Sequence, residues 1–231
     1  MAKKNLYNGC RYHQDLKAKV SLKYQKIFEL INDDLSILDI GCHTGTLGRA
    51  LKKRGNRIWG VEINSDAAEK AKQFYEKIIV GDIEDDDLWN AITQRFNVII
   101  FLDVLEHLVD PWRVLIKSKN VLKSKGFILI SIPNVAFYAV RRGLLFGKFN
   151  YQPSGILDKS HLRFFTFQSA QRLIQDCGYE IKEWYVTLSE LPFEYKVPFL
   201  KKLYNAFKPL LSKRFPNLFG AVIFFKAIPI K

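Results

Sequence analysis

The stretch 38–45, LDIGCHTG, combines an acid, two glycines and a histidine in a pattern that could hold a small ligand. An apolar run precedes it and a helical segment follows, an arrangement that brings backbone N–H groups close to a bound molecule. Gly41 and Gly45 permit positive φ angles and carry no side chain that would block that molecule. An ordinary strand-to-helix turn would explain the two glycines equally well, so this stretch needs support from other residues.

Two further acids follow later apolar runs, Glu62 at the end of the run from position 57 and Asp82 just after 77–80. If the three runs are neighbouring parallel strands, all three ends lie at one edge of the sheet. The Glu62 carboxylate can accept both hydroxyls of a ribose there. The Asp82 carboxylate can accept the exocyclic amine of an adenine while a backbone N–H serves a ring nitrogen. Three strand ends with suitable groups indicate a site for an adenosyl ligand.

A fourth group of reactive side chains, Asp103, Glu106 and His107, lies within five residues in the stretch 102–111. The stretch leaves an apolar run at its carboxyl end, where open α/β sheets place their ligands. In one interpretation His107 is a general base that takes a proton from a substrate hydroxyl. In another, the three residues hold a divalent metal that acidifies the hydroxyl. In a third, Glu106 and His107 only cap a helix and orient a loop.

Alternating strands and helices must position these groups. The apolar runs that we expect as strands are 36–40, 57–61, 77–80, 97–102 and 127–132. The expected helices between them are 46–53, 65–75 (capped by Ser65), 88–94 and 111–122. This alternation predicts a parallel sheet covered by helices on both faces, with right-handed connections. A helix at 167–177 and strands at 179–187 and 218–228 complete the expected order.

The length of 231 residues fits one domain with subdivisions. We expect a helical cap over 1–35, built on an amphipathic helix at 16–31, and a ligand-binding half over 36–135. A lid at 136–160 and a second half at 161–231, with an insertion at 188–216, would follow. Neither a signal peptide nor an apolar run long enough to cross a bilayer is visible, which favours a cytoplasmic protein or one attached at a membrane surface. Cys10, Cys42 and Cys177 have no spacing that suggests a disulfide framework or a zinc site.

On these motifs the sequence resembles the class I S-adenosylmethionine-dependent methyltransferases from about Ser36 to Phe165, and within them the ubiquinone-pathway O-methyltransferases. The resemblance implies a Rossmann-like, doubly wound α/β fold: a mostly parallel seven-stranded sheet with the last strand antiparallel, plus a helical lid. It implies S-adenosyl-L-methionine as cofactor. The residues that the resemblance assigns to binding this cofactor are Asp39, Gly41, Cys42, His43, Gly45, Glu62, Ile63, Asp82, Ile83, Leu102 and Asp103. His43 departs from the family pattern, which has a glycine there. A nicotinamide dehydrogenase would need Gly-x-Gly-x-x-Gly, which His43 and Thr46 break.

The resemblance also bears on catalysis. The ubiquinone-pathway enzymes and the small-RNA 3′-terminal 2′-O-methyltransferases carry Glu-x-x-Glu-His where this chain has Asp103, Glu106 and His107. The stretch 158–166 resembles a segment of small bacterial methyltransferases whose histidine, here His161, faces the substrate. His107 and His161 are therefore the catalytic candidates, and a metal would be held by Asp103, Glu106, His107 and His161. The alternative for His161 is a packing residue that fastens the lid.

The charge distribution bears on the acceptor. Of the net charge of +13, residues 1–31 carry +5, residues 32–136 carry −1 and residues 137–231 carry +9. The basic flanks suit an anionic partner or serve solubility alone. The basic amphipathic segments 138–149 and 199–215 suit a membrane surface, or a lid whose apolar face covers the site. We expect O-methylation of a small-molecule, sugar or lipid-linked acceptor; the alternatives are an RNA 2′-O-methyltransferase and a cofactor-binding protein without turnover.

Overall fold

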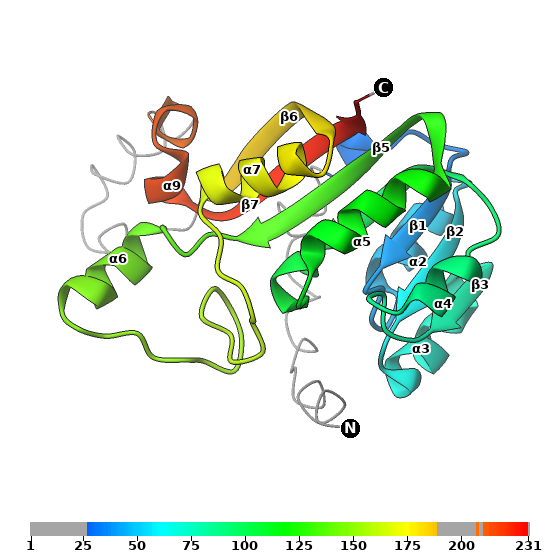
Figure 1. The fold of residues 1–231 in the computed structure, drawn as a ribbon, viewed down its shortest axis with the longest axis horizontal. Coiled ribbons are helices and arrows are strands. Elements are labelled where there is room, and N and C mark those ends of the chain that lie inside the picture. Colours follow the sequence, from blue (N-terminus) through cyan, green and yellow to red (C-terminus); the bar gives the residue numbers. More distant parts are fainter. Residues whose placement is uncertain (1–26, 189–206, 208–209, 231) are drawn as a thin grey trace.

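Seven strands form one sheet in the computed structural model, which describes residues 27–188, 207 and 210–230 (Figure 1). Their order across the sheet is β3-β2-β1-β4-β5-β7-β6. The strands are β1 (Ser36–Ile40), β2 (Arg57–Glu62), β3 (Lys77–Val80), β4 (Phe96–Leu102), β5 (Leu122–Pro133), β6 (Tyr179–Leu188) and β7 (Gly220–Pro229). Strands β1 to β5 pair in parallel, and β7 runs antiparallel to both of its neighbours, β5 and β6. The expected doubly wound α/β sheet with an antiparallel last strand is confirmed.

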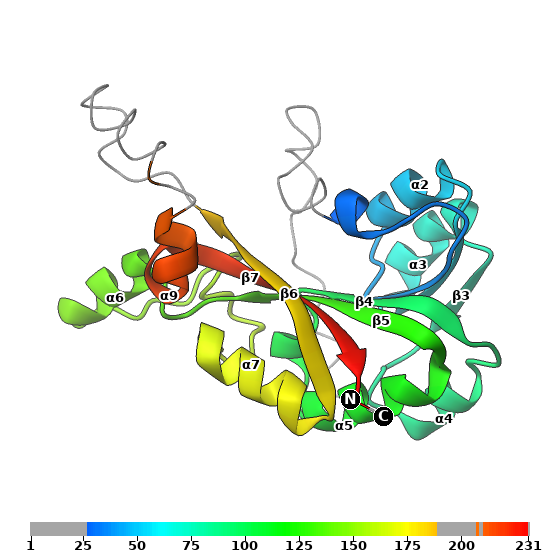
Figure 2. The ribbon, with the colours of Figure 1, turned by 90° about the horizontal axis from the view of Figure 1, so that it is seen from above.

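Helices cover both faces of the sheet (Figure 2). On one face lie α2 (Thr46–Lys52) and α3 (Ser65–Ala71); on the other lie α4 (Asp86–Asn90), α5 (Pro111–Ser118) and α7 (Phe167–Asp176). Two more helices, α6 (Tyr138–Leu145) and α9 (Pro216–Phe219), lie at the end of the sheet near β7. Short 3-10 turns follow α3, β4 and α5, at Lys72–Phe74, Leu105–His107 and Lys119–Val121. None of the helices within the described ranges is long and apolar enough to cross a membrane.

The central strands are apolar on both faces because a core lies on each side of them. In β4, Val98 and Ile100 belong to the core under α2, whereas Ile99 and Phe101 belong to the core under α4, α5 and α7. Successive side chains of a strand point to opposite faces, so a continuous apolar run fills both cores. The burial of β4 in both cores fixes the position of this strand, so the Asp103–His107 stretch begins directly after its last residue, Leu102.

Several predicted boundaries were wrong, and local contacts explain them. The helix expected over 65–75 ends at Ala71, and its N-cap is Asn64, whose side chain accepts a hydrogen bond from the N–H of Ala67 (2.9 Å), rather than Ser65. The helix expected at 88–94 spans 86–90 instead, and the one expected to reach 122 ends at Ser118. The last strand begins at Gly220 because α9 takes up residues 216–219. Most of the expected helix 16–31, of the insertion 188–216 and of the basic segment 199–215 lies outside the described residues.

Candidate functional site

The four motifs meet at one edge of the sheet, where β1, β2, β3 and β4 end. In the strand register Ile40 pairs with Val61 and with Phe101, and Glu62 pairs with Val80. The chain order reverses between β1 and β4, so the connections from these two strands lead to opposite faces and leave a crevice between them. The loops predicted to bind the cofactor therefore adjoin one another, and the His107 stretch is next to them.

The glycine turn after β1 requires its glycines. Gly41 and Gly45 have φ angles of 73° and 81°, and a Cβ at either would come within 3 Å of a side chain: 2.8 Å from Val104 Cγ2 and 2.9 Å from Phe74 Cδ2. His43, in the place of the family's glycine, also adopts a left-handed conformation, with φ of 46°. Such a backbone costs a residue with a side chain about 1 kcal/mol or more. His43 therefore adopts the left-handed backbone that this position of the turn requires, at that energetic cost.

Glu62 holds this turn in place. Its carboxylate is 7% exposed. One oxygen accepts a hydrogen bond from the backbone N–H of His43 (2.7 Å) and the other from that of Asn64 (2.9 Å). Each carboxylate oxygen has two lone pairs, so one on each oxygen is left for a ribose hydroxyl. Glu62 thus builds the turn and has the capacity to bind a ligand beside it, a double role that the motif alone did not reveal.

Asp39 accepts a hydrogen bond from Tyr75, a residue that the sequence analysis did not single out. The hydroxyl of the buried Tyr75, which follows the 3-10 turn after α3, donates to Asp39 Oδ2 at 2.6 Å. Burial and the neighbouring charge of Asp39 raise the pKa of the Tyr75 phenol, so it remains protonated and a donor. The side chain of Cys42 packs in the same core against Gly60, and burial, with the charges of Asp39 and Glu62, raises the pKa of its thiol. Only the backbone of Cys42 can therefore face a ligand.

We predict that Gly48→Ala destabilises the protein through Tyr75. A Cβ at Gly48, in the middle of α2, would overlap the Tyr75 ring and lie 2.6 Å from its hydroxyl oxygen. Overpacking of this kind costs about 1–3 kcal/mol, which lowers the melting temperature of a chain this size by roughly 2–10 °C. Thermal unfolding of Gly48→Ala and of the exposed control Arg49→Ala, on the same helix, measures the difference. Equal melting temperatures of these two variants would show that Tyr75 is not wedged as described.

The loops after β2 and β3 give the remaining predicted cofactor residues. Ile63 follows Glu62 directly and is partly buried. Asp82 Oδ1 accepts a hydrogen bond from the N–H of Glu84 (3.0 Å), and the carbonyl of the buried Ile83 accepts one from Trp89 Nε1 (2.8 Å). The Glu84 side chain in turn accepts the N–H of Asp110. These bonds hold the Asp82 loop beside the stretch that carries His107.

Asp103 directly follows β4 and has a left-handed conformation, with φ of 54°. The hydroxyl of Ser131, buried on β5, donates to Asp103 Oδ1 at 2.6 Å, and the Asp103 N–H donates to the Ser131 carbonyl at 3.1 Å. In the described part of the chain, three residues other than glycine have positive φ, and two of them, His43 and Asp103, lie in the predicted cofactor loops. Backbone strain of this kind concentrates at functional sites. Leu102, the last residue of β4, is partly buried beside Asp103.

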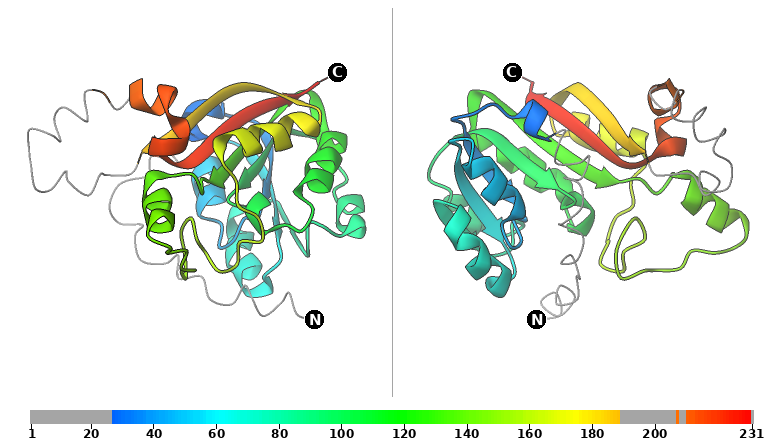
Figure 3. Two further views of the ribbon diagram at one scale, coloured as in Figure 1. Left: turned by 60° about the vertical axis from the view of Figure 1, so that its left-hand side comes forward. Right: turned by 180° about the vertical axis from the view of Figure 1, so that it is seen from behind.

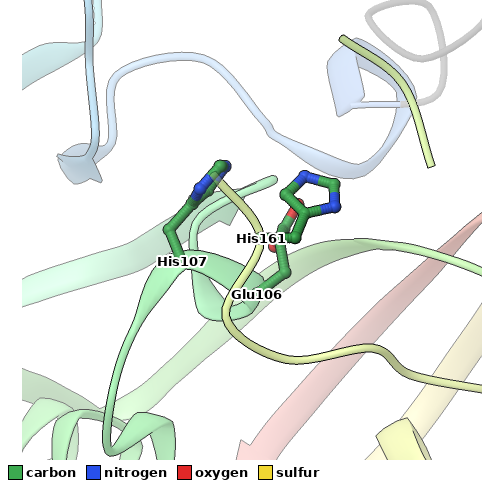
Figure 4. Close-up of side chains that lie close together, drawn as sticks. All are labelled: Glu106, His107 and His161. Atoms are coloured by element: carbon green, nitrogen blue, oxygen red, sulfur yellow. The ribbon is translucent and has the colours of Figure 1, made fainter. Parts of the chain in front are cut away.

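His107 and His161 lie together although 54 residues separate them in the sequence (Figure 4). Their ring centroids are 4.8 Å apart at an interplanar angle of 72°. The Glu106 carboxylate, 1% exposed, joins them: one potential ligand atom from each of the three residues lies within 4.8 Å of the other two. Asp103 is not part of this group, so three of the four residues predicted for a metal are brought together.

Two backbone carbonyls fix the protonation pattern of the histidine pair. His107 Nδ1 is 3.2 Å from the carbonyl of Ser160, and His161 Nδ1 is 3.1 Å from that of Ile156. A carbonyl can only accept, so both Nδ1 atoms carry the proton and donate it. The neutral form of each ring then has its lone pair on Nε2, the state that a general base or a metal ligand needs.

The loop that returns from the lid is clamped onto the 3-10 turn of His107. The N–H groups of Leu162 and Arg163 both donate to the carbonyl of Glu106, at 2.9 and 3.0 Å. The buried Asp158 accepts from the N–H (2.8 Å) and the hydroxyl (2.6 Å) of Ser160, which orients the carbonyl that His107 contacts. Neither contact has a signature in the sequence, because both depend on where a distant loop returns.

The pKa of His161 is lowered from its ordinary value of 6.5, first because the ring is partly buried and second because His107 would repel its positive charge. We expect His161 to titrate below pH 6.5 and to be neutral at pH 7. In His107→Asn the repulsion is lost, so the pKa of His161 will rise. Proton NMR titration of the four histidines, with His161 assigned by substitution, measures both values. An unchanged His161 pKa in His107→Asn would contradict the close pairing of the two rings.

Comparison with known proteins places this architecture in a family. A family model described as a methyltransferase domain matches residues 12–183, well over half of the chain. Two solved S-adenosylmethionine-dependent methyltransferases share the fold. The one from Thermotoga maritima has a TM-score of 0.60 and 19% identity, and the match covers 89% of this chain and 86% of that one. The one from Archaeoglobus fulgidus has a TM-score of 0.60 and 15% identity, and the match covers 89% of this chain and 90% of that one. The chain belongs to the class I S-adenosylmethionine-dependent methyltransferases, as the motifs predicted, and S-adenosylmethionine is the cofactor of that family.

Among curated relatives, a ubiquinone biosynthesis O-methyltransferase of Coxiella burnetii is 29% identical over 127 residues. The match covers 53% of this chain and 54% of that protein, so the chain spans about half the length of this relative. The predicted resemblance to that group of methyltransferases is therefore confirmed for the half that the match covers.

Proposed function

We propose that this chain transfers the methyl group of S-adenosylmethionine to an oxygen atom of a small-molecule acceptor that lies beside His107 and His161. One observation carries the proposal: the cofactor turn and the histidine stretch are in direct contact. The space left by the missing side chain of Gly41 is taken by Val104, two residues before Glu106. A methyl donor held by the turn would therefore lie next to the histidine pair.

The residues at the strand ends fit this cofactor. The turn has two glycines that no other residue could replace without a clash, and Glu62 has one lone pair on each oxygen for the ribose. We assign Asp82 and Ile83 to the adenine and Asp103 and Leu102 to the region of the sulfonium, because these residues end or follow β3 and β4 at the same edge of the sheet. When bound, S-adenosylmethionine supplies an electrophilic methyl group, so the protein needs to align the acceptor, exclude water and remove a proton.

His161 is the stronger candidate for removing that proton. Its lowered pKa keeps the ring neutral at pH 7, and its Nδ1 is held by a carbonyl so that Nε2 is the basic atom. The Nδ1 atom of His107 is likewise held by a backbone carbonyl, and its ring centroid is 4.8 Å from that of His161. A general base at this position contributes roughly 10²–10⁴-fold to such a transfer. Aromatic rings lie next to His161: the centroid of Phe164, four residues after the proposed lid over 136–160, is 6.1 Å from that of His161, and Phe149 of the lid is 5.5 Å from Phe164.

These rings favour an acceptor with an apolar or aromatic body. The curated relatives matched here are named for ubiquinone biosynthesis, which agrees with a small-molecule acceptor, and we extend this to sugar or lipid-linked acceptors. The test has two stages. Calorimetry of the full chain with S-adenosylmethionine and S-adenosylhomocysteine measures binding, and radiolabelled methyl transfer to phenols, polyprenyl-linked phenols, sugars and RNA oligonucleotides measures turnover.

We expect binding of both ligands and transfer to at least one phenolic or lipid-linked hydroxyl. Binding without any transfer would favour the cofactor-binding protein without turnover. Transfer to RNA alone, with an affinity that falls steeply as salt rises, would favour the 2′-O-methyltransferase. A folded chain that binds neither ligand would overturn the proposal.

A metal-assisted version of the same reaction is the second candidate, and the group of Glu106, His107 and His161 favours it. One carboxylate and two neutral imidazoles suit Zn²⁺, Mn²⁺ or Fe²⁺, whereas Asp103 is bonded to Ser131. A bound divalent ion supplies Lewis acidity that lowers the pKa of an acceptor hydroxyl. Calorimetric titration of chelator-treated protein with Mn²⁺ or Zn²⁺ tests this without an activity assay. Saturable metal binding that Glu106→Gln abolishes would support the metal-assisted reaction. If the protein binds no metal and keeps full turnover in EDTA, a histidine acts as the base without a metal.

A further inference from the structure

The tip of the lid exposes large apolar side chains, for which the sequence left two roles open: contact with a membrane surface, or a cover for the active site. In α6 only Val140 is buried. Leu144 is 50% exposed, Leu145 80% and Phe146 70%, and Tyr151 further along the loop is also exposed. Figure 3 shows from two sides that α6 and the loop after it extend away from the sheet. A cover for the active site would bury these residues, so the apolar face of the lid has another role.

A second exposed apolar group lies next to the first. Helix α9 contacts α6, and the two helices lie side by side at the same end of the molecule (Figures 1 and 2). The residues before α9 expose Phe207, Leu210 and Phe215. Scattered surface leucines need no explanation, but neighbouring groups of this size mark a surface that binds something apolar.

Exposed positive charges lie close in sequence to both groups. Arg141, Arg142 and Lys148 are exposed beside the first, and Lys213 and Arg214 beside the second. The sequence has no aspartate or glutamate in 137–151 or in 207–219. We call the exposed residues of these two stretches the lid-tip surface. Apolar side chains ringed by lysine and arginine are the pattern of helices that lie in the headgroup region of anionic membranes.

We propose that the lid-tip surface docks on an anionic lipid bilayer, with Leu145 and Phe146 inserted among the acyl chains and the surrounding cations on the headgroups. The charge and the side-chain types favour this occupant. A second copy of the chain would bring two positive surfaces together, and RNA would make no favourable contact with exposed aliphatic side chains. The lid-tip surface also continues toward the site, because the Phe149 ring contacts Phe164, which contacts His161. The docking itself does not depend on the proposed methyl transfer.

Sedimentation of the full chain with vesicles tests the docking. We expect binding to vesicles of phosphatidylglycerol and phosphatidylcholine, weakening with salt, and binding to phosphatidylcholine alone that is weaker by about ten-fold or more. The double variant L145S/F146S will lose binding by about ten-fold or more, and R142Q/K148Q will lose the preference for anionic vesicles. The control is Ile116→Ser, which removes a half-exposed apolar side chain from α5, away from the lid-tip surface. Thermal unfolding checks that all of these variants remain folded.

Three outcomes would overturn the docking. The first is equal binding of wild type and L145S/F146S to anionic vesicles; the second is no preference for the anionic lipid. The third is dimerisation in analytical ultracentrifugation that L145S/F146S abolishes, without vesicle binding, which would identify a second copy as the occupant. Since none of these measurements uses S-adenosylmethionine, a failed docking and a failed methyl transfer are distinguishable.

Discussion

Glu62→Ala is expected to weaken S-adenosylhomocysteine binding by about 100-fold or more, since each hydrogen bond to a charged group contributes roughly 1.5–3 kcal/mol. The carboxylate accepts the N–H groups of His43 and Asn64, so its removal also frees the glycine turn to which we assign the ligand. The ribose loses its acceptor and the turn loses its shape in one step. Calorimetry of the wild type and of Glu62→Ala measures the change.

Two further variants make the Glu62 result specific. Glu62→Gln keeps one acceptor oxygen but presents an NH₂ group to a backbone N–H, so we expect an intermediate affinity. Glu69→Ala removes an exposed acid from the neighbouring helix α3 and should leave binding unchanged. If Glu62→Ala bound the ligand as tightly as Glu69→Ala does, the assignment of the β2 end to the cofactor would fail.

His161→Ala is expected to reduce kcat by roughly 10²–10⁴-fold while the affinity for S-adenosylhomocysteine changes little, because in the proposed function the ring acts on the acceptor and not on the cofactor. His107→Ala should act in the same direction, since both rings share the arrangement of Nδ1 on a carbonyl. Leu162→Ala, an exposed neighbour of His161, is the matched control and should retain full activity. Transfer assays with whichever acceptor the screen described above yields, together with calorimetry, separate kcat from cofactor affinity.

The acidic side of the pH profile adds a readout that a purely structural histidine would not change. The pKa of His161 lies below 6.5, so turnover of the wild type should fall only as the pH drops through that lowered value. If His161→Ala retains wild-type kcat and the same acidic limb, His161 only fastens the lid, and the chemistry must come from other residues.

The sequence by itself determined the sheet and which residues gather at one edge of it, the edge to which we assign the cofactor. Short continuous apolar runs, alternating with helical segments, leave few arrangements for a chain of this length. Once the strands are parallel, the residues at their carboxyl ends must lie at one edge, so the strand order alone brings Asp39, Glu62 and Asp82 to the same edge. These inferences are local: each depends on a run of a few residues and on the geometry of a strand.

Contacts between distant segments were decided only by the tertiary structure. Tyr75 reaches Asp39 across 36 residues, and His161 reaches His107 across 54, through a loop whose return is set by two bonds to the Glu106 carbonyl. The sequence also suggested that the apolar residues of the lid cover the site, yet Leu145 and Phe146 face solvent. The physical reason is common to all three: periodicity tells which side of an element is apolar, but the partner of that side depends on how long loops close, which no local pattern encodes.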